Sequence, residues 1–167
     1  MRTHPNILVN PAAGQRTEIL RRADQLEDRI DLRVGIEHVG GGGGPPHVHP
    51  NQTEHFHVLH GKLRVILGDQ ELLLGRGEEA TVPPGTVHTF SAAEDDTEFD
   101  VRVSPALRIE AALEDGYELF DRGLYALQCL TVGERGWSLQ IERPIVDRAA
   151  NNRTPQPLSR GCSQPGI

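Results

Sequence analysis

The chain has 167 residues, a formal net charge of −7, and a hydrophobic fraction of 37%. This length suits one domain with one sizeable core, and an acidic balance without a dominant basic patch argues against nucleic-acid or membrane partners. The 18 glycines and 12 prolines indicate frequent turns, which favour many short strands over long helices.

The cysteines, the N-terminal residues and the apolar runs each argue against one further class of protein. Cys129 and Cys162 fit neither a disulfide framework nor a C-x-x-C metal site. Residues 1–10 lack the charged and apolar regions of a signal peptide. No apolar run approaches the ~18 residues of a membrane helix, so we expect a cytoplasmic protein.

Residues 1–29 are predicted to form an N-terminal hairpin or arm. Two short apolar stretches, at residues 6–9 and 17–20, flank turn chemistry at residues 10–14. From residue 30 the pattern changes to strict alternation, which predicts a half-buried strand. Its apolar positions are Ile30, Leu32, Val34 and Ile36.

A run of glycines occupies residues 40–44 and precedes two prolines. Such a run binds phosphate when a helix N-terminus follows it, and no helix pattern follows here. We therefore predict a loop between strands.

From residue 30 to residue 104, short strand patterns recur every eight to twelve residues with turn signals between them. This spacing is typical of an all-β sandwich or barrel. Residues 105–148 are predicted to be a helical extension, because apolar residues follow at helical spacing from Ile109 to Leu127. Two short helices, or a late strand near residues 137–141, remain open alternatives. The polar tail at 149–167 is predicted to be disordered.

The barrel region contains a histidine-rich pattern that suits a metal. His47 and His49 are two apart, so in a strand both imidazoles point to one face. A turn at residues 50–53 can bring Glu54 back beside them, and His88 follows a tight Pro-Pro-Gly turn. Three neutral imidazoles and one carboxylate suit one divalent transition metal ion, with Fe, Mn, Ni, Co, Cu and Zn all open.

The same residues make the sequence resemble the cupin superfamily. The first cupin motif is matched at every spacing, and the second ends in Ala92 where the family has an asparagine. The matching residues are Gly41, His47, His49, Glu54 and Gly61, then Gly77, Pro83, Gly85 and His88. The gap between the motifs, residues 62–76, resembles that of compact, quercetinase-like microbial cupins.

The resemblance implies a double-stranded β-helix, or jelly roll, followed here by a C-terminal helical segment. It also implies that His47, His49, Glu54 and His88 hold a metal inside the barrel, with Glu54 serving as the catalytic base as well. His55 and His57 have the opposite strand parity from Glu54 and are expected to point outward. Candidates for a substrate pocket are His38, Phe56, Val58, Phe90 and Arg102.

A cupin fold does not determine the reaction. We consider a metal-dependent dioxygenase acting on a small organic molecule first. A non-redox isomerase, cyclase or lyase is the second reading, and a small-molecule or metal-binding protein without turnover is the third. A homodimer is expected, with the N-terminal hairpin as a candidate interface.

Overall fold

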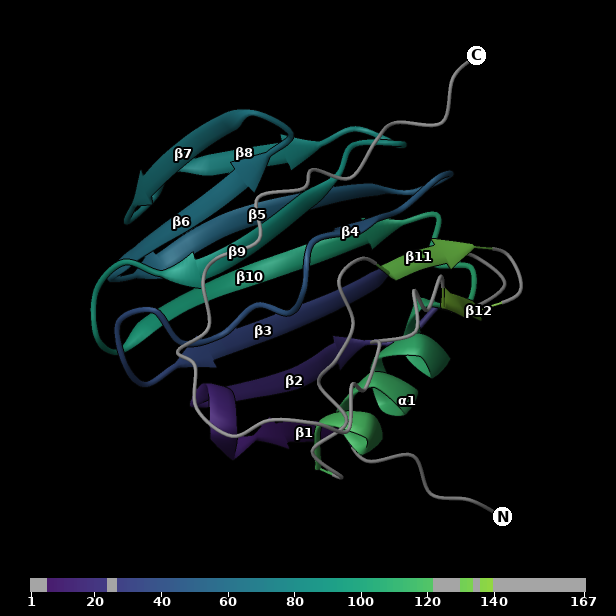
Figure 1. The fold of residues 1–167 in the computed structure, drawn as a ribbon, viewed down its shortest axis with the longest axis horizontal. Coiled ribbons are helices and arrows are strands. Elements are labelled where there is room, and N and C mark those ends of the chain that lie inside the picture. The colour runs from purple at the N-terminus through teal and green to yellow at the C-terminus, as the bar shows by residue number, and fades with distance from the viewer. Residues whose placement is uncertain (1–5, 24–26, 122–129, 134–135, 140–167) are drawn as a thin grey trace, which may run out of the picture.

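The computed structural model describes residues 6–23, 27–121, 130–133 and 136–139. Within these residues the chain forms two six-stranded sheets, whose inward side chains share one hydrophobic core (Figure 1). In order across the first sheet, the strands are β1 (Ile7–Asn10), β2 (Gln15–Arg21), β3 (Ile30–Ile36), β10 (Thr97–Ser104), β5 (Thr53–His60) and β8 (Glu79–Val82).

In the second sheet the order is β12 (Gly136–Leu139), β11 (Leu130–Gly133), β4 (His47–Val48), β9 (His88–Ala92), β6 (Lys62–Leu67) and β7 (Gln70–Gly75). All neighbouring strands are antiparallel except β11 and β4, which pair in parallel. The predicted jelly roll is confirmed.

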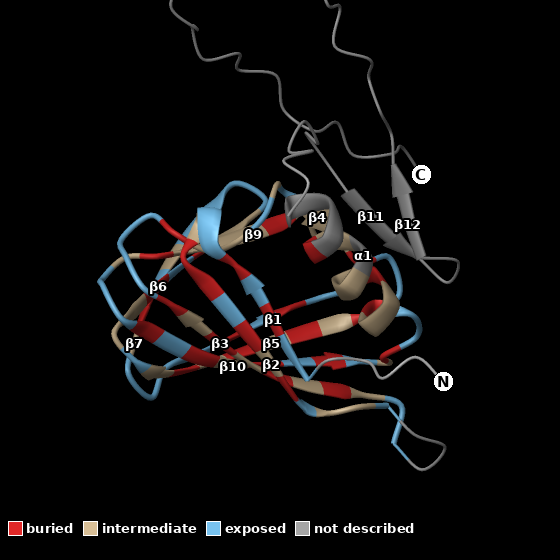
Figure 2. Cartoon of the chain, turned by 90° about the horizontal axis from the view of Figure 1, so that it is seen from below, coloured by how far each residue is buried: buried red, intermediate tan, exposed pale blue. Residues whose placement is uncertain are grey.

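The alternation along the strands explains which side chains fill the barrel. Ile30, Leu32, Val34 and Ile36 of β3 are all buried, and the residues between them are not. The strands β5 and β10 follow the same pattern, and Figure 2 shows buried and more exposed positions alternating along the sheet. A period of two places every second side chain in the core.

The N-terminal hairpin is part of the first sheet. β1 pairs with β2, and β2 pairs with β3. Between β1 and β2, the 3-10 helix η1 (Pro11–Ala13) is capped by the Asn10 side chain and followed by Gly14 in the left-handed conformation. The hairpin therefore widens the sheet that carries β5.

The α-helix α1 (Ile109–Asp121) follows the last barrel strand and lies beside the β1–β2 hairpin (Figure 1). Ile109 and Ala112 of α1 belong to the hydrophobic core. The buried Tyr117 hydroxyl lies 2.8 Å from Gln15 Nε2 and 2.5 Å from Thr17 Oγ1. Apolar packing and this polar contact together hold the helix on β2.

The C-terminal extension contains strands as well as a helix. The helix continues through Gly116 to Asp121 as one segment. The late strand that the sequence allowed near residue 137 is present as β12, paired with β11. The end of the helical pattern at residues 124–127 and the tail predicted at 149–167 lie outside the described residues. None of the described helices has the length and apolar character that a membrane crossing requires.

The glycine run forms a tight loop between β3 and β4. The amides of Gly40, Gly41 and Gly42 donate to the carbonyls of Ala92, His38 and Ala13. These donors are already used within the protein, and the strand β4 follows instead of a helix. The loop therefore lacks both features of a phosphate-binding loop.

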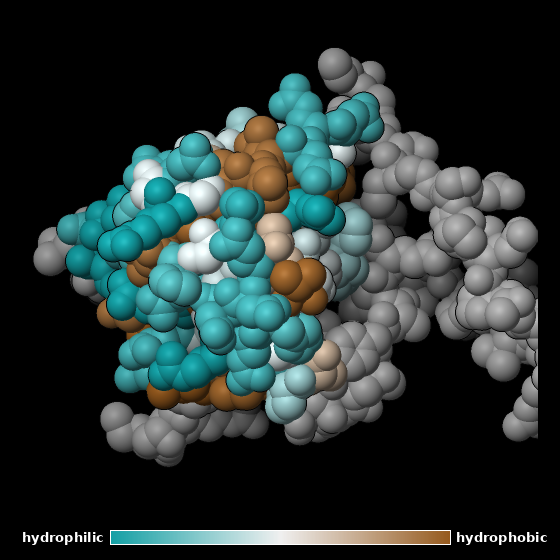
Figure 3. Space-filling view, turned by 90° about the vertical axis from the view of Figure 1, so that its left-hand side faces the viewer, coloured by the Kyte–Doolittle hydropathy of each residue, from teal (hydrophilic) through white to brown (hydrophobic). Residues whose placement is uncertain are grey.

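One end of the barrel has a mainly polar surface. Figure 3 shows the end of the molecule at the left of Figure 1 as largely hydrophilic, with hydrophobic side chains in small areas. Such scattered hydrophobic exposure is ordinary for folded proteins.

Candidate metal centre

The two halves of the predicted motif meet across the second sheet. β4 and β9 pair so that His47 and His88 lie directly opposite each other. The backbone amide of Gly85, in the turn before β9, donates to the carbonyl of His49 over 2.9 Å. This hydrogen bond brings the His88 turn beside the His-x-His segment.

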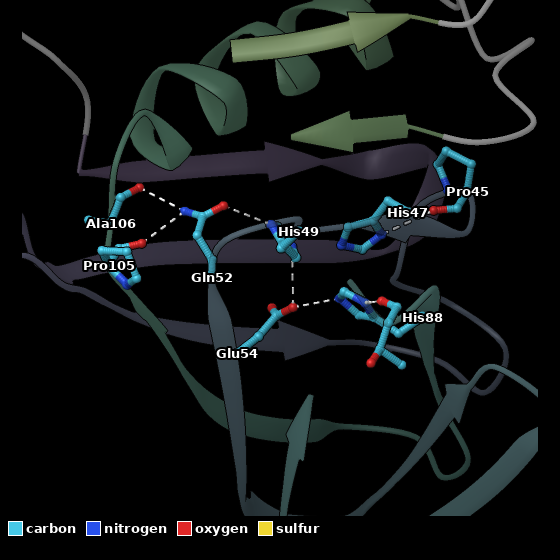
Figure 4. Close-up of polar contacts among 9 residues, drawn as sticks. Pro45, His47, His49, Gln52, Glu54, His88, Pro105 and Ala106 are labelled. Atoms are coloured by element: carbon cyan, nitrogen blue, oxygen red, sulfur yellow. Dashed lines mark hydrogen bonds and ion pairs between the residues drawn. The ribbon is translucent and has the colours of Figure 1, made fainter. Parts of the chain in front are cut away.

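Glu54 comes from the facing sheet. It lies on β5, where Glu54, Phe56 and Val58 all point into the barrel. Ligand atoms of His47, His49, Glu54 and His88 lie within 4.8 Å of one another (Figure 4). The structure thus brings together the four residues that the sequence analysis selected.

The cluster is compact and buried. Glu54 Oε2 lies 2.7 Å from His88 Nε2 and 3.4 Å from His49 Nε2. The His47 ring centroid is 4.2 Å from that of His88 and 5.0 Å from that of His49. His49, Glu54 and His88 are buried, whereas His47 is only half-buried. His47 is therefore the member of the cluster closest to solvent.

Each imidazole is held by its Nδ1 atom. Nδ1 lies 3.2 Å from the Pro45 carbonyl in His47 and 2.9 Å from the Thr86 carbonyl in His88. In His49 it lies 3.1 Å from Gln52 Oε1. A carbonyl oxygen only accepts, so each Nδ1 carries the proton and donates it. In the neutral ring, Nε2 then keeps its lone pair, and Nε2 of His49 and His88 faces Glu54.

The ionisation of the cluster follows from its burial and its charges. Burial alone would raise the pKa of Glu54, but the hydrogen bonds and charges of His49 and His88 outweigh it and hold that pKa well below its ordinary value. Burial lowers the pKa of His88, but the hydrogen bond to Glu54, the charge of Glu54 and the hydrogen bond to Thr86 together outweigh burial and raise this pKa. A proton between His88 and Glu54 therefore balances the buried carboxylate.

His47 behaves differently. Although the residue as a whole is half-buried, its ring lies within the cluster, and this burial together with the positive charge of His88 lowers the pKa of His47 to about 3. This imidazole is therefore neutral at physiological pH, which is the form that binds a metal.

These residues fit a transition metal. A buried carboxylate and three imidazoles with anchored Nδ1 atoms converge from two sheets. Such a donor set needs a positive charge at its centre, and a divalent ion supplies one. The hydrogen bonds at Nδ1 are the outer contacts that orient histidine ligands in metal sites.

An aromatic group lies one inward position further along the strands. Phe56 follows Glu54 by two residues, and Phe90 follows His88 by two. The rings of Phe56, Phe90 and Phe99 have centroids 5.3 to 6.0 Å apart. Val58, also expected near the pocket, is fully buried in the core beyond Phe56. The interior next to the cluster is therefore apolar.

The structure does not bring His38 and Arg102 to the cluster. His38 is exposed, and its ring lies against Gly14 at the end of the hairpin turn. Arg102 was expected to line the pocket. It lies instead on the outer face of β10 and forms an ion pair with Asp31 over 2.8 Å. Its neighbours Val101 and Val103 take the inward positions, because only alternate residues of a strand face the core.

The outward histidines lie where strand parity placed them. His55 and His57 line an outer depression of about 550 Å³ together with Glu79, Asp100 and Arg102. The charges there pair with one another: Arg33 binds Asp100, and Arg102 binds Asp31. His60 is exposed at the end of β5, where its ring contacts the Asp96 carbonyl.

The sequence analysis missed Gln52. It lies in the segment predicted as a turn, where a polar residue is expected to be exposed, yet its side chain is only 1% exposed. No spacing rule signals its contact with His49, because the partners that bury it, Pro105 and Ala106, are more than 50 residues away.

The family comparison agrees with this architecture. A family model described as a cupin domain matches residues 36–103. The match runs from the end of β3 to near the end of β10, so it includes both halves of the motif and all four clustered residues. None of the curated proteins matches the chain.

Several solved structures are similar in fold. An HTH_3 family transcriptional regulator from Vibrio cholerae is 18% identical with a TM-score of 0.51, and the match covers 57% of this chain and 54% of the regulator. KdgF from Halomonas sp. is 22% identical with a TM-score of 0.49, over 59% of this chain and 93% of KdgF.

An RmlC-like cupin from Shewanella frigidimarina is 16% identical with a TM-score of 0.46, over 55% of this chain and 77% of that one. The chain therefore spans about half of the Vibrio regulator and most of the two smaller proteins. At these identities the likeness concerns the fold and not the activity.

Proposed function

Because the chain belongs to the cupin superfamily, we propose that it is a metal-dependent enzyme that acts on a small organic molecule. The single observation that carries this proposal is the convergence of His47, His49, Glu54 and His88, with the Nδ1 atoms of the three histidines anchored. A purely structural barrel core is not stabilised by a buried carboxylate, because burying that charge costs free energy unless it is paired.

The residues have distinct roles in this proposal. His47, His49 and His88 hold the ion through Nε2, and Glu54 supplies the negative charge. When bound, the ion supplies the redox or Lewis-acid chemistry that side chains lack. Glu54 is also the group placed to accept a proton from the substrate, and the aromatic group of Phe56, Phe90 and Phe99 excludes water from the interior side.

Between the possible reactions, we favour a dioxygenase. A non-redox isomerase, cyclase or lyase that moves a proton between two substrate atoms needs a second positioned acid or base besides Glu54. Among the described residues, the buried polar side chains outside the cluster are already engaged: Gln52 contacts His49, Asn10 caps η1, Gln15 and Thr17 contact Tyr117, and Thr97 contacts Lys62 and Glu94. An apolar interior beside the cluster suits a reaction driven by a redox-active metal.

The test begins with the metal. The protein, purified without chelators and then loaded separately with Fe²⁺, Mn²⁺, Co²⁺, Ni²⁺, Cu²⁺ or Zn²⁺, is expected to bind one ion per chain by elemental analysis. Variants that replace His88 or Glu54 are expected to lose it. A wild-type protein that neither retains nor rebinds any of these ions would overturn the proposal.

The second step separates the reaction classes. Loaded protein is offered hydroxylated aromatic and enolisable compounds, flavonols included, while O₂ uptake is followed with an electrode. A dioxygenase consumes O₂ with product formation and stops under nitrogen. Turnover that continues without O₂, or with Zn²⁺ as the only metal, would favour the non-redox reading. Binding of these compounds without turnover under any condition would favour the binding-protein reading.

A further inference from the structure

We propose that Gln52 is a positioning residue, which orients the metal ligand His49 and couples the metal centre to the segment that leads into α1. This inference rests on the metal binding proposed above and extends it to a residue outside the ligand set. Figure 4 shows Gln52 between His49 on one side and Pro105 and Ala106 on the other.

Both the NH₂ group and the oxygen of the Gln52 amide form hydrogen bonds, in three contacts. Its Nε2 lies 3.0 Å from the Pro105 carbonyl and 2.9 Å from the Ala106 carbonyl. Its Oε1 lies 3.1 Å from Nδ1 of His49. The side chain is 1% exposed, so water does not substitute for any of these partners.

These contacts determine the orientation of the amide. Two carbonyl oxygens face one end of the side chain, and only the NH₂ group can donate to both of them. The oxygen must then face His49. Because Oε1 accepts, His49 Nδ1 must carry a proton, so in the neutral ring Nε2 is the nitrogen left to bind a metal. The backbone of a distant segment thus selects the tautomer of a metal ligand.

The role of Gln52 differs from that of the other two anchors. His47 and His88 donate to the carbonyls of Pro45 and Thr86, each two residues away along the chain. These two hydrogen bonds need only the local chain at His47 and at His88 to be folded. His49 instead depends on a side chain whose own position depends on Pro105 and Ala106, which follow β10.

The segment after β10 is itself tied to the barrel and to the helix. The Ala106 amide donates to the Asp28 carbonyl over 3.0 Å, and the Ile109 amide at the start of α1 donates to the Ala106 carbonyl over 3.0 Å. The Ala106 carbonyl therefore accepts from both Gln52 and the helix start. A metal that holds His49 in place will also hold this carbonyl, and with it the first turn of α1.

The first experiment measures metal affinity in the variant Gln52→Met, which keeps the size of the side chain and removes its hydrogen bonds. Zn²⁺ affinity is determined by competition with a chelating dye. We expect about 10- to 100-fold weaker binding than in the wild type, as is typical for loss of an outer contact to a histidine ligand. Unchanged affinity would overturn the positioning role.

The matched control is Gln15→Met. Gln15 is also buried, and it also contacts α1, through Tyr117, but it does not touch the cluster. This variant is expected to lower thermal stability while leaving Zn²⁺ affinity within about twofold of the wild type. An equal loss of affinity in both variants would mean that Gln52 acts only through general stability, which would also overturn the inference.

The second experiment tests the tautomer and the coupling in the wild-type chain, so it does not depend on a variant that folds. In ¹⁵N NMR, His49 is expected as the Nδ1–H tautomer with a slowly exchanging proton. In hydrogen exchange, Zn²⁺ is expected to slow the amides of Ala106 and Ile109 by at least tenfold, and this protection is expected to be lost in Gln52→Met. An Nε2–H tautomer, or protection that is equal in the two proteins, would contradict the proposal.

The outcomes also separate this inference from the proposed function. If the wild type binds no metal, the proposed function fails. If the wild type binds Zn²⁺ and Gln52→Met binds it equally well, only the role of Gln52 fails, and the metal centre stands.

Discussion

The histidines of the cluster show how single hydrogen bonds prepare a metal site. An imidazole has two nitrogens, and the one that binds a metal is set by the partner of the other. Here backbone carbonyls hold Nδ1 of His47 and His88, and a side-chain amide holds that of His49. The three rings are therefore oriented before a cation arrives, which lowers the cost of ordering the ligands on binding.

Removal of the charge at Glu54 is expected to weaken metal binding strongly. Glu54→Gln keeps the size of the side chain but removes the only carboxylate of the cluster. We expect divalent-ion affinity to fall by more than about 100-fold, beyond the loss typical of outer contacts, in a chelator-competition assay. Glu79→Gln on the outer face of β8 is the control and should bind as the wild type does. Equal affinities in both variants would contradict the role of Glu54.

Metal affinity is expected to fall at acid pH because of His88. Burial alone would lower its pKa, but the hydrogen bonds to Glu54 and Thr86 and the charge of Glu54 together raise it. Binding the ion must displace this proton, so below the raised pKa the apparent Kd is expected to increase by up to about tenfold per pH unit. Glu54 stays ionised, since its pKa is lowered, and His47, with a pKa of about 3, stays neutral. A pH-independent Kd between pH 5.5 and 8 would contradict this prediction.

At the scale of elements, the loop at residues 40–44 shows why a run of glycines is needed between β3 and β4. Gly43 has a φ of +65°, and a Cβ built there would lie 2.0 Å from the Phe90 carbonyl oxygen. The loop passes so close to β9 that no side chain fits. Phe90 follows His88 on that strand, so the loop also packs beside the candidate metal site.

Gly43→Ala is therefore expected to be strongly destabilising. It adds a backbone clash to the cost of a left-handed conformation, which is about 1–2 kcal/mol by itself. Gly68→Ala is the control, because Gly68 has a φ of +55° but open space around its Cβ position. In urea unfolding, Gly43→Ala should lose about 2 kcal/mol more than Gly68→Ala. Equal losses would show that the loop relaxes around the new methyl group.

At the scale of the whole molecule, the described residues form two six-stranded sheets that enclose one core. β1 is the edge of the first sheet, and its Ile7 and Val9 are 45% and 55% exposed. An edge strand offers unpaired backbone groups, and apolar side chains beside that edge add a hydrophobic contribution. We expect two copies of the chain to pair through β1.

The pairing is tested by size exclusion with light scattering at micromolar concentration. The wild type is expected to be a dimer, and Ile7→Glu with Val9→Glu is expected to give a monomer. Leu73→Glu is the control, since Leu73 is 53% exposed on β7, the edge of the other sheet. It should remain a dimer. A monomeric wild type would refute the expectation, and a dimer lost only in the control would move the interface to β7.

Much of this protein is determined by its sequence alone. The alternation in residues 30–36 requires a half-buried strand, because period two separates inward from outward positions. The same parity places His47 and His49 on one face and correctly sends His55 and His57 outward, whereas the resemblance to the cupin motifs added Glu54 and His88 to the cluster. The strand and the parity of these histidines depend on residues close together along the chain, so the local sequence pattern predicts them.

Other features were decided only by the tertiary structure. Arg102 and His38 were expected in the pocket but lie outside the barrel, because the direction of a strand face is settled by the sheet that packs against it. From its position, Gln52 was expected to be an exposed turn residue, but in the structure it is buried against Pro105 and Ala106. Each of these outcomes depends on segments far apart in sequence, and only the folded chain brings such segments into contact.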